Sequence, residues 1–303
     1  MPGLADMHVH FMPDDDSTNH RLLRLYLANG ITTLLNLEGT PAHVRMRQAI
    51  AEWRVLGPRL YTSGPAVRDT GLTREGGARL VEEHRAAGYD VVKIYNGASR
   101  EGCRGILAAA HRAGIPVVGH VARSLGLEGT LGAGQRGIVH LEEYLYTYFP
   151  FRNSDTTLVP ERVLDPEAIP YLARNTARAG TWVTPTLVAF ESILAQAENL
   201  DSVLARPEVS YVPRPVLGSV GWLPDRNPYR KRFWHPAHHR NHRHALRYQV
   251  AMVRPFHGAG VRLLAGTDAL IPGVVPGFSL IPIGNYLGNR FVHVGQRKRH
   301  RSP

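Results

Sequence analysis

The sequence predicts an α/β fold, a (β/α)8 barrel of the TIM type, over residues 1–280. Short apolar strands alternate with helices of about 10–15 residues, a pattern typical of parallel strands joined by right-handed crossovers. Eight such strands can be assigned, which suits a barrel of roughly 250 residues. A doubly wound open sheet is the alternative, but it would usually have about five or six strands and a glycine-rich phosphate-binding turn, which is absent here.

The expected elements follow one another along the chain with short connections. The strands cover residues 4–10, 31–37, 59–63, 91–95, 116–120, 137–140, 181–185 and 261–266. Helical patterns cover residues 22–27, 41–56, 73–87, 100–113, 166–179 and 245–259, with a weaker helix after the fifth strand. Gly30, Gly88 and Gly114 end three of these helices, as glycine commonly does just past a helix C-terminus.

Two segments depart from this pattern. Residues 190–239 contain six prolines and little periodicity, so we expect an irregular insert after the seventh strand. Ordinary βα loops have about 2–6 residues. In a barrel this insert would lie on the catalytic face, where it could be a lid or a passive surface excursion, and both interpretations stay open.

The end of the chain is also atypical. Residues 281–289 are poor helix formers with proline and glycine, so the barrel is expected to be incomplete at its last helix. Residues 281–303 then form an atypical basic tail, and such a tail is more often disordered than a designed binding arm.

Composition narrows the function classes. The formal net charge of +11 invites a nucleic-acid interpretation, but no supporting motif accompanies it, so no specific nucleic acid is expected. The single cysteine, Cys103, excludes intrachain disulfides and thiolate-rich zinc sites. No signal peptide or membrane-spanning run of roughly 18 apolar residues is visible. We expect a cytoplasmic protein with a small-molecule substrate and no membrane partner; homo-oligomerisation stays open.

Residues able to bind metal or transfer protons stand at the ends of the expected strands. His8 and His10 are two residues apart on the first strand, so their imidazoles project from the same face. The other positions are Lys93 on the fourth strand, His120 and His140 at the ends of the fifth and sixth, and Asp268 just after the eighth. The carboxyl ends of barrel strands meet at one mouth, which brings these groups together. Each alone has an ordinary explanation, but a buried lysine is costly unless it is paired or modified.

These residues lie in short motifs that together resemble the amidohydrolase superfamily, in the subgroup that includes imidazolonepropionase and the Xaa-Pro dipeptidases. The motifs are PGLADMHVH at 2–10, VKIY at 92–95, VGHV at 118–121, IVHL at 138–141 and LAGTDA at 264–269. They occur in the family's order from residue 2 to about residue 280. No single motif is specific, but the set is.

The resemblance implies a metal-dependent hydrolase acting on amide, peptide or related C–N, ester or phosphoester bonds. It implies a centre of two divalent ions, most simply zinc, in which His8, His10 and Asp268 hold one ion and His120 and His140 the other. Lys93, carboxylated by CO2, would bridge them as a carbamate. A metal-activated hydroxide would attack, and Asp268 would carry its proton to the leaving group.

Further residues near these motifs are weaker candidates. Tyr95 faces the same way as Lys93 by strand alternation, so it is expected either to bind substrate or to pack in the core. Glu142 and Tyr144, with Glu143 between them, follow His140 and are expected to contact substrate. Five histidines between residues 235 and 244 suggest a second metal site, but a solvated helix start is favoured.

Two departures from the family pattern lead to a second hypothesis. Members usually carry a small accessory β-sandwich built from segments outside the barrel, and this sequence lacks it. The chain is therefore expected to be a truncated member, with an exposed apolar strip beside the first and eighth strands. The alternative function is accordingly a catalytically inactive remnant with no role or only a binding role.

Overall fold

The computed structural model describes residues 3–149, 163–219, 221–232 and 236–280. Its strands are short and parallel, and they form two sheets of order β1-β2-β3 and β4-β5-β6-β7. The strands are β1 (Leu4–Val9), β2 (Ile31–Asn36), β3 (Arg59–Thr62), β4 (Val92–Ile94), β5 (Val117–Gly119), β6 (Gly137–Val139) and β7 (Trp182–Thr184). All seven lie within the strands that the sequence predicts.

Isolated bridges join the two sheets into a ring. Ser63 pairs with Val91 in parallel, which connects β3 to β4. The segment 261–269 takes the place of the eighth strand, pairing through Leu263 with β7 and through Ala269 with β1. The segment forms no regular strand between these bridges, and Asp268 within it adopts a left-handed φ of 63°. The ring therefore closes beside the site where β1 ends.

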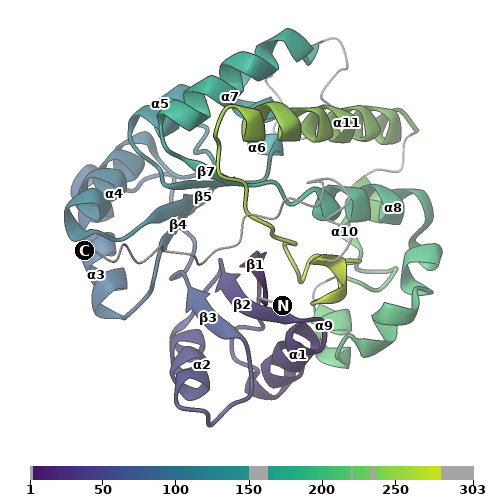
Figure 1. Ribbon diagram of the computed structural model, residues 1–303. Helices are drawn as coiled ribbons and strands as arrows, with labels where there is room; N and C mark the ends of the chain where they lie inside the picture. The colour runs from purple at the N-terminus through teal and green to yellow at the C-terminus, as the bar shows by residue number, and fades with distance from the viewer. Residues whose placement is uncertain (1–2, 150–162, 220, 233–235, 281–303) are drawn as a thin grey trace, which may run out of the picture.

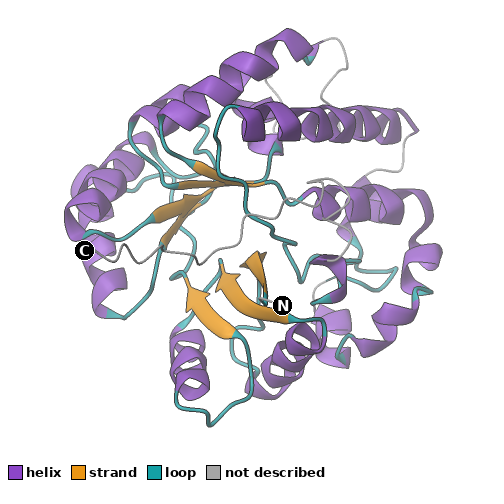
Figure 2. Cartoon of the chain, viewed as in Figure 1, coloured by secondary structure: helices purple, strands orange, loops and turns teal. Residues whose placement is uncertain are grey.

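The helices form an outer layer around the strands (Figures 1 and 2). The barrel helices are α1 (Asp16–Ala28), α2 (Pro41–Ala51), α3 (Arg74–Ala86), α4 (Arg100–Ala113), α5 (Gly126–Gly132), α6 (Glu142–Tyr148) and α7 (Ile169–Arg178). The later ones are α8 (Leu187–Leu204), α9 (Arg214–Ser219), α10 (Pro228–Arg232) and α11 (Pro236–Gly258), with short 3-10 turns at Pro166–Ala168, Pro207–Tyr211 and Phe278–Leu280. In the residues that the structure describes, no helix is both long and apolar enough to cross a membrane.

Local sequence explains most helix ends. Thr73 and Ser99 cap α3 and α4, each with its hydroxyl oxygen accepting from a backbone amide three residues on. Gly114 ends α4 in the left-handed conformation at φ 69°. The helix predicted over residues 41–56 stops at Ala51, because Trp53 adopts a left-handed φ of 60° that cannot continue a helix.

Residues 190–239 are more helical than the sequence predicts, so the expectation of an irregular insert is wrong for most of them. Most of the segment lies in α8, α9, α10, the first turns of α11 and one 3-10 turn. Several of its prolines stand at helix starts: Pro207 begins the 3-10 turn, Pro228 begins α10 and Pro236 begins α11. Proline is tolerated in a first turn because its missing amide needs no partner there.

The closure seam is covered in the described part of the chain. Val9 packs in one cluster with Leu22 and Leu23 of α1 and with Leu270 and Val275 that follow the eighth segment. All five side chains are buried. Among the described residues, the exposed Tyr211 stacks on Phe278 beside this cluster, but the side chains of the seam itself are buried, so the expected apolar strip is not found over the seam. The predicted basic tail, 281–303, lies outside the described residues.

Candidate metal centre

The predicted site residues come together at one end of the barrel. Seven of them line a single cavity of about 920 Å³: His10, Lys93, Tyr95, His120, His140, Glu142 and Asp268. A volume of this size is typical of a small-molecule site. His8 is fully buried just beneath, with its Nε2 3.1 Å from Asp268 Oδ1.

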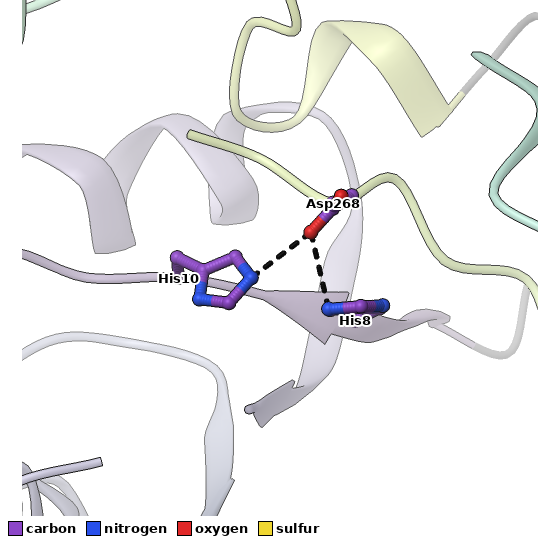
Figure 3. A group of neighbouring side chains, drawn as sticks. All are labelled: His8, His10 and Asp268. Carbon is purple, nitrogen blue, oxygen red and sulfur yellow. Dashed lines mark hydrogen bonds and ion pairs between the residues drawn. The ribbon is translucent and has the colours of Figure 1, made fainter. Parts of the chain in front are cut away.

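His8, His10 and Asp268 form the tightest group (Figure 3). One nitrogen of each imidazole and one carboxylate oxygen all lie within 4.8 Å of one another. His10 Nε2 lies 2.9 Å from the same Asp268 oxygen that His8 approaches. Two imidazoles and a carboxylate are a donor set that divalent zinc accepts.

The His8 ring shows that this group suits a metal ion. Its side chain is fully buried, and neither ring nitrogen makes a hydrogen bond within the described residues. His8 Nε2 lies within ion-pair distance of Asp268, but the two atoms are not aligned for a hydrogen bond. A buried polar nitrogen without a partner costs about 1–3 kcal/mol, and a metal ion would relieve that cost at Nε2.

His120 and His140 stand beside this group, each oriented through its second ring nitrogen. His120 Nδ1 lies 2.7 Å from Glu143 Oε1, and His140 Nδ1 lies 2.6 Å from the hydroxyl of Thr186. With Nδ1 engaged in both rings, Nε2 is left as the coordinating atom, an arrangement typical of metal-binding histidines. The two ring centroids are 4.9 Å apart, and His140 Nε2 lies 3.9 Å from Asp268 Oδ2.

Burial keeps these imidazoles neutral. It lowers the pKa of His140 to about 3 and moves the pKa values of His8 and His120 well below their usual value. Burial alone would raise the pKa of Asp268, but the surrounding imidazoles, including His10 at hydrogen-bond distance, favour the carboxylate and hold that pKa well below its usual range. Neutral imidazole and ionised carboxylate are the forms that bind metal.

Lys93 reaches the same cavity from the middle of β4. Its side chain is 2% exposed, and it makes no ion pair with any carboxylate in the described part of the chain. Burial lowers the pKa of its ammonium to about 8, although Asp268 and Glu38 favour the charged form. An unpaired lysine at this depth is unusual and marks a functional position.

The backbone turns sharply where the ligands leave their strands. His140, Thr186 and Asp268 are all non-glycine residues with left-handed φ values of 71°, 48° and 63°. Such residues cost about 1–3 kcal/mol each and cluster at functional sites. The turn at Asp268 is supported by Asp6, which accepts hydrogen bonds from the Thr267 amide at 3.0 Å and the Thr267 hydroxyl at 2.6 Å.

The candidate substrate residues divide into two groups. Tyr95 and Glu142 line the cavity, and the Tyr95 ring lies 4.3 Å from that of His120. Tyr144 does not: it is fully buried in the core, its hydroxyl lies 3.0 Å from that of Thr176, and its ring packs against Phe256. The structure thus corrects the expectation that Tyr144 contacts substrate.

Glu143, given only a general role from the sequence, has a defined position. Its side chain is fully buried, and its two oxygens accept from His120 Nδ1 at 2.7 Å and from the Val121 amide at 3.2 Å. Burial raises the pKa of this carboxyl to about 7. The only indication of this role in the sequence is that Glu143 is an acidic residue three positions after His140. The spacing does not indicate that its carboxylate pairs with His120.

The insert forms a wall of the cavity. Phe190, Ile193, Ser219 and Tyr229 of the insert line it, together with His242 just beyond the insert in α11. The first of these packs against His140 with ring centroids 6.3 Å apart. The insert is therefore not a passive excursion.

The histidine-rich start of α11 also differs from expectation. His242 is 2% exposed, and its Nε2 lies 2.9 Å from the Phe190 carbonyl oxygen, so this part of the helix start is not solvated. Among the described residues of this helix start, no group of three or more histidine, cysteine or acidic side chains lies close enough to hold a metal ion.

Comparison with known proteins identifies the family of the chain and the solved structures that share its fold. A sequence profile of the Amidohydrolase family matches residues 1–287. No curated protein matches the sequence. Solved structures that match include a bottromycin amidohydrolase, at TM-score 0.66 and 23% identity over 95% of this chain and 62% of that one. An A. niger ochratoxinase matches at TM-score 0.62 and 18% identity over 95% of this chain and 67% of that one.

A third match is a Xaa-Pro dipeptidase with methionine bound in its active site, at TM-score 0.58 and 17% identity over 94% of this chain and 70% of that one. This chain thus spans between three fifths and three quarters of the length of these structures. At such identities the likeness concerns the fold, and it confirms the predicted barrel.

Proposed function

This chain belongs to the amidohydrolase family, and we propose that it is a metal-dependent hydrolase that cleaves an amide, peptide or related bond in a small molecule. The observation that carries the proposal is the group formed by His8, His10 and Asp268, whose donor atoms lie within 4.8 Å of one another. The buried, unpartnered nitrogens of His8 make this group better suited to a cation than to its own hydrogen bonds.

We propose two divalent ions, with zinc the first choice for these nitrogen and oxygen donors. His8, His10 and Asp268 would hold one, and His120 and His140 the other. When bound, such ions lower the pKa of a water molecule and polarise the bond to be cleaved. Glu143 and Thr186 orient the imidazoles of the second pair, since each engages Nδ1 and leaves Nε2 available to an ion.

Lys93 would complete the centre as a carbamate. Its buried amine, in the neutral form, adds to CO2: one N–C bond forms and one proton is released. The product carries one negative charge shared by two oxygens, and each oxygen could bind one of two cations. Support comes from the burial of Lys93 beside the histidines without an ion pair in the described residues.

Asp268 would move the proton. Its carboxylate is held near His8 and His10, and its low pKa keeps it ionised and able to accept a proton from the attacking water. Asp268 lines the cavity, so its carboxyl group could deliver that proton to the leaving group. Tyr95 and Glu142 line the space beside it and would contact substrate.

The location and partners belong to the same proposal. A cytoplasmic location is consistent with one buried free cysteine, Cys103. The cavity volume suits a small molecule rather than a nucleic acid.

The test is metal content and activity measured on the same preparation. The purified protein should contain about two divalent ions per chain. It should hydrolyse members of a panel of dipeptides, N-acyl amino acids, lactones and phosphoesters, and lose that activity on chelation. His10→Asn should lower both metal content and rate, while the exposed control His257→Asn should change neither. A chain that takes up no metal after supplementation would overturn the proposal and favour the inactive alternative.

A further inference from the structure

Two arginines line the cavity, and their surroundings differ. Arg68 is neutralised: its two terminal nitrogens lie 2.9 and 2.7 Å from the two oxygens of Glu38, and its guanidinium stacks 4.4 Å above the Tyr95 ring. A bidentate pair of this kind uses the fork of donors that arginine offers to a carboxylate. Arg68 is therefore part of the wall.

Arg123 has no such partner. In the part of the chain that the structure describes, no carboxylate lies within ion-pair distance of its guanidinium, and its side chain donates no hydrogen bond. Its charge lies over the Tyr146 ring, 4.5 Å from the centroid. A cation held over an aromatic face keeps its in-plane N–H groups available, because the ring contacts only the flat side of the guanidinium.

The position of Arg123 is nevertheless fixed. It follows His120 by three residues, and its backbone amide donates to the Asn96 carbonyl at 2.9 Å, which ties the loop after β5 to the loop after β4. The nearby Tyr146 hydroxyl donates to Glu142 Oε2 at 3.3 Å, so this carboxylate is engaged with the tyrosine. Arg123 is a partly buried, oriented cation on the cavity wall.

We propose that Arg123 binds a carboxylate of the substrate and so selects for amides of amino acids, in which a free carboxylate lies close to the bond that is cleaved. The inference rests on the proposed function for the identity of that bond. A planar guanidinium matches a carboxylate with two parallel hydrogen bonds, and hydrogen bonds to charged groups are the stronger ones in proteins. Glu142 and Glu143 lie close enough to interact with the charge of Arg123, but neither pairs directly with its guanidinium in the described residues. A substrate carboxylate would supply that direct partner, and a neutral substrate would not.

The experiment separates binding from hydrolysis. N-acetyl amino acids and their carboxamides differ only in the charge of one group, and titration calorimetry on the metal-free protein measures their affinity without turnover. The wild type should bind the acids about 10- to 100-fold more tightly than the matched carboxamides. Arg123→Met should remove this difference by weakening the acids alone, and Arg123→Lys should keep part of it.

Arg136→Met is the matched control. Arg136 also lies over an aromatic ring, at 5.5 Å from the centroid of Trp182, but it does not line the cavity. This variant should keep the full preference for acids. A preference that survives Arg123→Met, or a wild type that binds no acid of the panel more tightly than its carboxamide, would overturn the inference. A preference for acids without hydrolysis by the zinc-loaded protein would overturn the proposed function and leave the role of Arg123 standing.

Discussion

Removing the Glu143 carboxylate should weaken metal binding by His120 and His140. It should not change metal binding by His8, His10 and Asp268. The side chain is fully buried, and it is the oriented acceptor for His120 Nδ1 at 2.7 Å and for the Val121 amide at 3.2 Å. A hydrogen bond to a charged acceptor contributes about 1.5–3 kcal/mol. If that energy is used to orient the His120 ring, its loss corresponds to roughly a 10- to 150-fold lower affinity for one ion. A similar loss, about 10- to 100-fold, is typical when the hydrogen-bond partners of metal-binding histidines are changed in other proteins.

The assay is zinc titration against a chromophoric chelator at pH 8, above the raised pKa of Glu143, so that the carboxylate is ionised. Glu143→Ala should weaken one binding step and leave the other near the wild-type value. Glu143→Gln should have a smaller effect, because its amide oxygen can still accept from His120. Glu82→Ala, on the exposed side of α3, is the control for changes in net charge. Two unchanged binding steps in Glu143→Ala would refute the positioning role.

Three further changes test other parts of the site and its support. Lys93→Ala should lower metal content and activity, and acetate or propionate should partly restore both by replacing the carbamate; a variant that binds two ions normally would exclude the bridge. Tyr144→Phe should cost about 1 kcal/mol of stability in thermal unfolding and leave kcat/KM nearly unchanged, since one buried hydrogen bond is lost far from substrate. A large loss of activity would instead return Tyr144 to the substrate site. Gly119→Ala should lower stability by about 2 kcal/mol or more, because its Cβ would lie 2.2 Å from the Ile94 oxygen at a φ of +130°. Gly132→Ala, with open space around it, should be neutral or slightly stabilising, and equal effects of the two glycine changes would contradict this account.

The fold and most of the site follow from patterns that a sequence displays directly. Parallel strands place their carboxyl ends at one mouth, so a histidine or aspartate just past an apolar run is placed by strand order alone. Strand order alone therefore predicts that the side chains of five residues meet at this mouth: His8, His10, His120, His140 and Asp268. The eighth strand was also located, although its irregular backbone depends on the neighbours that it bridges.

The errors come from elements whose geometry depends on tertiary packing. Residues after His140 enter α6, where successive side chains turn by about 100°. Glu143 consequently points to His120, and Tyr144 points to the core. Strand alternation could not distinguish them. Similarly, the prolines of the insert were interpreted as breaks, whereas three of them begin helices or helical turns. The helices of the insert pack against residues far away in the sequence, for example Val216 against Leu22 in one cluster. Local periodicity therefore gives little indication that this segment is helical.

Anomalous X-ray diffraction from crystals of the zinc-loaded protein tests the central claim most directly. The account predicts two zinc peaks in the cavity, one bound by His8, His10 and Asp268 and the other by His120 and His140, with density for a carbamate on Lys93 between them. A zinc peak bound by other residues, or a cavity without zinc in protein supplied with zinc and bicarbonate, would contradict it.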